Sequence, residues 1–162
     1  DYVSLYNTDS DADGNSRFGQ IDGDAGDDCF SIDGNPKPGV TRNNPGVPEG
    51  HLGDILGGAG SDTITIKNVM AVEEIKGESG NDCISVMSSE FDLLQGGAGN
   101  DEISVSSWRS SEAIQGNAGD DFITATMYTR SPFTGDVSGG SGSDFCCVDN
   151  TAVTSGCETD CT

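Results

Sequence analysis

Residues 57–66 read GGAGSDTITI, and the chain repeats this stretch several times. The near-copies GDAGDDCFSI, GESGNDCISV, GGAGNDEISV, GNAGDDFITA and GGSGSDFCCV begin at residues 23, 77, 96, 116 and 139. Every copy has glycine at its first and fourth positions and aspartate at its sixth, followed by a short alternating run. A motif that recurs in this way is typical of a solenoid, in which each repeat forms one coil.

The residues that follow each aspartate alternate with a period of two, which predicts a strand. The second and fourth residues after the aspartate form two apolar columns, and a third column lies two residues before the first glycine. These columns are Phe30, Ile64, Ile84, Ile103, Ile123 and Cys146; Ile32, Ile66, Val86, Val105, Ala125 and Val148; and Ile21, Ile55, Ile75, Leu94, Ile114 and Val137. Stacked about 4.8 Å apart, such ladders form a narrow dry core. We therefore expect an all-β, right-handed parallel β-solenoid with two short strands in each coil.

The repeats resemble the RTX glycine- and aspartate-rich nonapeptide G-G-x-G-x-D-x-U-x, in which U is a large apolar residue. The resemblance covers six copies between residues 23 and 148 and implies a calcium-binding parallel β-helix. The implied calcium ligands are Asp28, Asp62, Asp82, Asp101, Asp121 and Asp144. The motif returns every 19 to 23 residues, apart from one 34-residue gap, so the calcium turns are expected along one edge only. Abundant cysteine is a second departure from the family pattern.

The motif also suits calcium on chemical grounds. Calcium prefers six to eight oxygen ligands from carboxylates, carbonyls and water. Glycine permits positive φ and close backbone approach, which lets a turn direct its carbonyl oxygens inward. One aspartate per turn, with carbonyls from two stacked turns, would form such a cage, and we expect about five or six ions along the edge. The first glycines of the motifs belong to this expected site: Gly23, Gly57, Gly77, Gly96, Gly116 and Gly139.

Two further acidic features precede the first full motif. Residues 1–5, DYVSL, align with residues 101–105, DEISV, so that Asp1 corresponds to a motif aspartate. We interpret the chain as a piece of a longer protein, with the open coil face covered by upstream sequence or by a neighbouring subunit. Asp9, Asp11 and Asp13 resemble the opening of an EF-hand loop, although Gln20 stands where a bidentate glutamate is expected. A calcium-binding turn and a solvated loop remain alternatives there.

The charge of the chain limits its partners. A net charge of −21 over 162 residues would suggest disorder on its own, but bound calcium would cancel about half of it. An acidic chain without a basic patch is not expected to bind nucleic acid or anionic membranes. No apolar segment approaches the roughly 20 residues that span a bilayer, so direct membrane insertion is not expected.

The six cysteines favour an oxidising, extracellular compartment. Four lie after residue 145, which predicts a disulfide-rich C-terminal cap or the start of another region, and six cysteines allow fifteen pairings. Cys29 and Cys83 share an outward column two coils apart, beyond the reach of a disulfide, so each is expected to pair with a loop, the cap or another chain. Zinc at Cys157 and Cys161 is the alternative for the cluster.

The expected organisation is a calcium-binding solenoid over residues 1–148, with an excursion loop at 33–52, and a cysteine-rich end at 149–162. We do not expect an enzyme, because the chain has a single histidine, His51, and lacks a zinc-protease, nucleophile-elbow or phosphate-binding motif.

The function expected is that of a structural or adhesive segment of a larger secreted surface, matrix or filament protein. Its partners would be other parts of that protein or neighbouring subunits, and its many Ser and Thr residues allow O-linked glycans. One alternative is a calcium-dependent accessory domain of a secreted enzyme or toxin. Another is an ice-binding solenoid, although the outward turn residues are too irregular to favour it.

Overall fold

The structure is a computed structural model that describes residues 2–6, 17–34, 51–69, 71–107, 113–127, 135–148 and 153–158. These residues form strands and turns, and none of them is in a helix. No segment among them is therefore a helix long and apolar enough to cross a membrane. Asp1, Asp9, Asp11, Asp13, Cys161 and most of the predicted excursion lie outside the described residues.

The strands form two parallel sheets. A seven-stranded sheet contains β1 (Tyr2–Tyr6), β4 (Cys29–Asp33), β7 (Thr63–Lys67), β9 (Cys83–Met87), β11 (Glu102–Ser107), β13 (Phe122–Met127) and β15 (Phe145–Val148), in that order. A nine-stranded sheet contains β2 (Arg17–Phe18), β3 (Ile21–Asp22), β5 (His51–Leu52), β6 (Ile55–Ala59), β8 (Ala71–Ser79), β10 (Phe91–Ala98), β12 (Ala113–Ala118), β14 (Asp136–Ser141) and β16 (Val153–Ser155). Each coil contributes one strand, or two short ones, to the second sheet.

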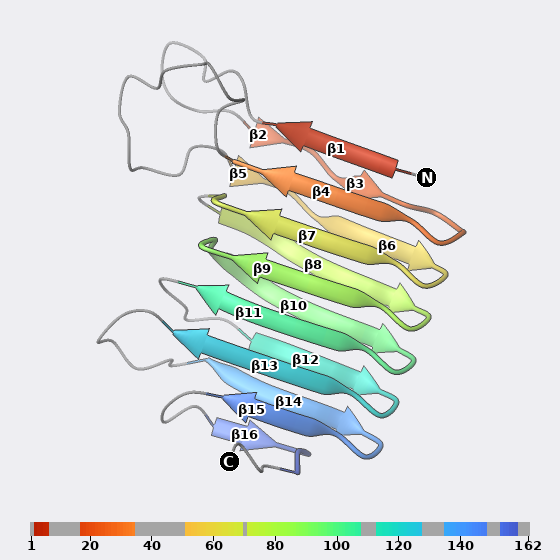
Figure 1. Cartoon of the computed structure of the whole chain (residues 1–162), viewed down its shortest axis with the longest axis vertical. Coiled ribbons are helices and arrows are strands. Elements are labelled where there is room, and N and C mark those ends of the chain that lie inside the picture. The colour runs from red at the N-terminus through yellow and green to blue at the C-terminus, as the bar shows by residue number, and fades with distance from the viewer. Residues whose placement is uncertain are drawn as a thin grey trace.

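The chain winds as a right-handed solenoid. In Figure 1 the nearer strands run leftward, the farther strands run rightward, and successive coils descend from the N-terminal end. The motif turns connect the two sheets along the right-hand edge of that view. The expected all-β parallel solenoid, with its glycine-aspartate turns on one edge, is thus confirmed.

The register confirms the predicted core columns. Ile64 pairs with Ile84, and Ile103 pairs with both Ile84 and Ile123, so the same column position faces inward in successive coils. These isoleucines are fully buried. Toward the ends of the described stack, Ile21 and Val148 are only partly buried. A continuous apolar ladder is what fixes the register, because a slip of one residue would turn every buried side chain outward.

A fourth apolar column was not predicted. Leu52, Val72 and Phe91 are opposite one another in the nine-stranded sheet and are 5%, 1% and 1% exposed. Each lies three residues before the predicted column at Ile55, Ile75 and Leu94, and this shared spacing was the available signal.

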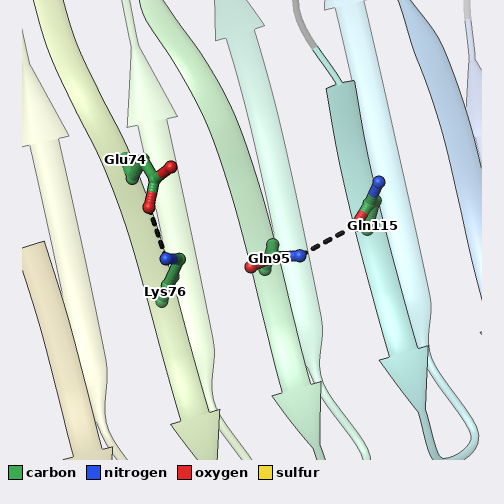
Figure 2. A network of polar contacts seen from close by, with 4 residues as sticks. All are labelled: Glu74, Lys76, Gln95 and Gln115. Carbon is green, nitrogen blue, oxygen red and sulfur yellow. Dashed lines mark hydrogen bonds and ion pairs between the residues drawn. The ribbon is translucent and has the colours of Figure 1, made fainter. Parts of the chain in front are cut away.

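The outward face of the nine-stranded sheet carries polar contacts between neighbouring side chains (Figure 2). Lys76 forms an ion pair with Glu74 in β8, and the side-chain amide of Gln95 donates to Gln115 Oε1 at 2.8 Å, joining β10 to β12. All four side chains are partly exposed, and surface pairs of this kind contribute little free energy, of the order of 0–1 kcal/mol. The stability of the solenoid must therefore come from its core and its turns.

The ends of the predicted segments fall inside strands. Asp33 closes β4, and His51 and Leu52 form β5, so the two ends of the predicted 33–52 excursion belong to the sheets. At the other end, β16 extends the nine-stranded sheet to Ser155, past residue 148. The coil therefore continues into the cysteine-rich segment.

Candidate calcium site

The six motif aspartates form a single file along the turn edge. Each stands just before a strand of the seven-stranded sheet, at the end of its glycine turn. All six are between 1% and 5% exposed: Asp28, Asp62, Asp82, Asp101, Asp121 and Asp144. Ionised carboxylates are rarely buried unless they are paired or bind a metal. This file is therefore the strongest sign of function in the molecule.

One oxygen of each carboxylate from Asp62 to Asp144 joins its coil to the preceding one. The backbone N–H of Asp28 donates to Oδ1 of Asp62 at 2.8 Å, and the N–H of Asp62 donates to Oδ1 of Asp82 at 2.8 Å. The same bond, at 2.9 Å, links Asp82 to Asp101, Asp101 to Asp121, and Asp121 to Asp144. The resulting ladder fixes one oxygen of five carboxylates, from Asp62 to Asp144, and Asp28 joins it through its backbone N–H.

The other oxygen has no hydrogen-bond partner. Oδ2 of all six aspartates is buried and accepts no hydrogen bond. A Cβ added to the first glycine of each motif would meet this oxygen closer than 3.0 Å, as at Gly57, where the distance to Asp62 Oδ2 would be 2.6 Å. At Gly57 the same point lies 2.7 Å from the carbonyl oxygen of Gly77 in the following coil. An unpartnered carboxylate oxygen and a carbonyl oxygen therefore converge on the space that the missing side chain leaves.

This arrangement fits calcium. A buried anionic oxygen without a partner costs several kcal/mol of folding free energy unless a cation accompanies it. Hard oxygen donors of two kinds meet there, which is the donor set that calcium prefers. Among the described residues no three His, Cys, Asp or Glu side chains cluster together. Each ion would therefore be held by motif carboxylates together with backbone carbonyls, including those of the first glycines.

Burial also changes the protonation of the file. Desolvation raises the pKa of Asp62, Asp82 and Asp121, although the backbone hydrogen bond from the preceding coil partly offsets it. Desolvation raises the pKa of Asp101, in the middle of the file, to about 7, with the neighbouring charges of Asp82 and Asp121 adding to the shift. Without a cation, these buried carboxyl groups are therefore protonated more readily than ordinary aspartates.

A second ladder, which the sequence did not reveal, runs outside the first. At the fifth motif position, Oδ1 of Asn81 accepts from the N–H of Asn100 at 2.8 Å, and Oδ1 of Asn100 accepts from the N–H of Asp120 at 2.9 Å. These residues are exposed, and the bonds run in the opposite direction along the stack. The small polar residues at this position therefore form hydrogen bonds between neighbouring turns, in addition to fitting into the turn.

The fold and the site define a calcium-binding β-solenoid. The family model for the RTX calcium-binding nonapeptide repeat (4 copies) matches residues 88–106 and 110–126. These segments contain the motifs that begin at Gly96 and Gly116, and the chain thus carries RTX-like repeats, which are calcium-binding repeats. No curated protein and no solved structure matches the chain.

We expect Asp101→Asn to stabilise the protein without calcium and to destabilise it with calcium. The amide keeps an oxygen for the Asp82 N–H but removes a buried charge, so in chelator the variant should be more stable than the wild type at pH 8. In saturating calcium it should be less stable, because a ligand is weakened. Urea unfolding measures the difference in calcium, and the β signal in circular dichroism without urea compares how much of each chelated protein is folded.

The pH dependence supplies the control for that variant. A folded-state pKa of about 7 for Asp101, against its ordinary value of 3.8, favours the neutral form in the folded state. This stabilising contribution is complete below about pH 4 and is lost as the pH rises through 7. Chelated wild-type protein should therefore lose stability over this range, and Asp101→Asn should lose less. Parallel pH profiles for the two proteins would contradict a buried charge at this position.

The cysteine-rich end carries disulfides as expected, but the expected pairing of Cys29 and Cys83 with a loop or the cap is not found, because both thiols are free. Cys146 and Cys157 form a disulfide with a Cα–Cα distance of 5.5 Å, and Cys147 is disulfide-bonded as well. Cys29 and Cys83 are free and both pair with Thr63, which places them two coils apart in one outward column. The prediction that these two cannot bond to each other agrees with this register. Pairing of either with another chain remains a prediction.

Alkylation of the native protein tests this thiol assignment. We expect a maleimide to modify exposed Cys83 and, more slowly, half-buried Cys29, while Cys146 and Cys157 stay unmodified until reduced. Although Cys83 is exposed, partial desolvation by its neighbours, with the charge of Glu102 adding to it, raises the pKa of its thiol, so the rate of alkylation should climb steeply with pH. Peptide mass spectrometry reads the sites, and a peptide linking Cys29 to Cys83 would refute the assignment.

Proposed function

We propose that this chain is a calcium-stabilised structural segment of a larger extracellular protein, such as a surface, matrix or filament component. The observation that carries the proposal is the file of six buried aspartates, each with an unpartnered Oδ2. A site repeated in register along a whole edge suits a scaffold, because every coil depends on the ions between it and its neighbours. A single binding event would need only one such site.

The charge of the chain supports a role that depends on calcium. With a net charge of −21, the chain repels itself in the compact state when no counter-ion is bound. Extracellular calcium modules bind with Kd values of about 10⁻⁴ to 10⁻³ M. Such sites fill in calcium-rich surroundings outside cells and empty where free calcium is low. The segment would then become rigid only after export.

Two observations support an extracellular location. RTX repeats are typical of secreted proteins. The Cys146–Cys157 disulfide is the kind of bond that forms and persists in oxidising compartments. The proposed partners are flanking parts of the same protein or neighbouring subunits, with O-linked glycans on exposed Ser and Thr residues.

The proposal assigns no catalytic step to the chain. Each motif carboxylate, from Asp62 to Asp144, holds one oxygen in the ladder and directs the other toward a glycine turn. Such carboxylates are committed to the stack, which makes them poor candidates for acid–base chemistry. An accessory domain of a secreted enzyme or toxin would use the same calcium stack, and the two functions differ in what the stack is attached to.

Protease treatment of intact cells that produce the full-length protein tests the location and the role together. We expect the segment to be cleaved from outside when the medium contains EGTA and to resist cleavage in millimolar calcium. A segment protected in both media until the cells are lysed would contradict an extracellular location. Equal cleavage in both media would contradict stabilisation by calcium.

A further inference from the structure

The last described coil begins its turn as the others do. β16 pairs with β14, and Ser155 lies opposite Ser138. Gly156 therefore stands where the other coils have the first glycine of the motif. A Cβ added at Gly139 would meet the carbonyl oxygen of Gly156, just as one added at Gly116 would meet the carbonyl oxygen of Gly139.

The turn is then cut short. Glu158 forms a parallel bridge with Phe145, and its N–H donates to the carbonyl oxygen of Asp144 at 2.7 Å. Phe145 makes the equivalent bond to Asp121 at 2.8 Å, so Glu158 holds the place that directly follows a motif aspartate. Only Cys157 separates Gly156 from Glu158, whereas the five residues 140–144 separate Gly139 from Phe145.

Cys157 thus stands in the place of the aspartate. It is half-buried, packs against the core, and is bonded to Cys146, which is fully buried in the inward column opposite Ile123. The shortened turn has no carboxylate to accept the N–H of Asp144, and it lacks most of the residues whose carbonyls a full turn would offer. Among the described residues the aspartate ladder therefore ends at Asp144.

We propose that the Cys146–Cys157 disulfide is the end clamp of the calcium stack. The interval between two successive motif aspartates is the expected site of one ion, and the clamp keeps the interval between Asp121 and Asp144 in the geometry that binds its ion. The proposal rests on the calcium-binding function of the repeats. The interval between Asp101 and Asp121 has a full motif turn beyond it, because the Asp144 turn follows. In the part of the chain that the structure describes, the interval between Asp121 and Asp144 has only the clamped coil beyond it. At this interval the disulfide holds the following coil in place, whereas at the earlier intervals a further calcium-binding turn does so.

The clamp can be opened by an external dithiol. A dithiol thiolate attacks the sulfur of half-buried Cys157 and forms a mixed disulfide, while Cys146 leaves as a thiolate and takes up a proton. The second thiol of the reagent then displaces Cys157, so that the reagent becomes a cyclic disulfide and the protein gains two thiols. The protein accepts two electrons and two protons in total, and the reagent supplies both.

Hydrogen exchange read by mass spectrometry tests the clamp, with calcium held near the midpoint of binding. Opening it with dithiothreitol should speed exchange in residues 139–148 by at least about tenfold, equivalent to about 1.4 kcal/mol, and leave residues 57–66 unchanged. Cys157→Ala should do the same without reagent, because it removes the clamp and leaves the buried Cys146 side chain in place. This variant is needed because the reagent also reaches the disulfide of Cys147. Cys83→Ala, at a free cysteine, should match the wild type.

Each result decides the question. Faster exchange confined to the last turn, in both the reduced protein and Cys157→Ala, supports the clamp. Equal acceleration in every turn would make the bond a general staple and overturn the proposal, as would no change in Cys157→Ala. If the oxidised wild type shows no calcium-dependent protection in any turn, the calcium-binding function fails, and the clamp fails with it.

Discussion

Removing calcium with EGTA is expected to unfold or loosen most of this chain. Each buried Oδ2 would then lack a partner, and neighbouring carboxylates would repel one another along the stack. Each coil adds only a few apolar side chains to the core, such as Ile75, Ile84 and Val86 in one coil. So narrow a core does not readily compensate for a row of uncompensated buried charges.

The expected size follows from linkage. With free calcium about tenfold above a Kd of about 10⁻⁴ to 10⁻³ M, each site contributes RT ln 11, or about 1.4 kcal/mol. The six described aspartates define five intervals, and five such sites contribute about 7 kcal/mol. This is comparable with the whole stability of a typical domain, about 5–15 kcal/mol.

Circular dichroism and thermal melting, with calcium and with EGTA, measure this effect. The β signal should fall in EGTA, with structure persisting best near the Cys146–Cys157 disulfide. Magnesium should restore the signal poorly, because it demands a tight octahedron and keeps its waters. An unchanged signal and Tm in EGTA would show that calcium does not hold the solenoid together.

The sequence predicted the repeating parts of this molecule well, because repetition turns weak local signals into a register. One isoleucine after one aspartate says little, but Ile64, Ile84, Ile103 and Ile123 at one motif position define a stacked column. The same logic placed the six aspartates together on one edge. That they are calcium ligands remains a prediction, supported by their unpartnered oxygens.

The parts that the sequence did not predict lie where the repeat changes. The column of Leu52, Val72 and Phe91 precedes the motif and mixes residue types, so it did not stand out beside the glycines. The Asn81–Asn100 ladder depends on hydrogen bonds between coils, which follow from register rather than from composition. The shortened turn at Cys157 became visible only once Gly156 and Glu158 were seen in register with Gly139 and Phe145.

Gly80→Ala is expected to destabilise the chain strongly, and Gly26→Ala provides a matched control. Both are fourth motif glycines with positive φ, +134° at Gly80 and +126° at Gly26, so alanine is strained at either position. They differ in their surroundings. A Cβ at Gly80 would lie closer than 3.0 Å to the carbonyl of Gly60 in the preceding coil, whereas one at Gly26 has nothing within 4 Å.

The difference between the two variants isolates the contact between coils. Backbone strain alone should cost Gly26→Ala about 1–3 kcal/mol. Gly80→Ala should lose a further 1–3 kcal/mol or more, because the carbonyl is backbone and must move to make room. For a chain of this size that extra loss corresponds to a Tm lower by about 2–4 °C per kcal/mol.

Urea unfolding in saturating calcium gives both values, and calcium titration of the same variants gives a second measurement. Gly80→Ala should also bind calcium more weakly than Gly26→Ala. The carbonyl that must move belongs to Gly60, in the turn that ends at Asp62, and the substituted turn ends at Asp82, so the interval between these two aspartates is distorted. Equal losses in the two variants would mean that the turns do not touch as closely as the stack requires. Close contact between turns is what allows two coils to share one ion. Gly80→Ala should therefore lower both the stability of the chain and its calcium affinity.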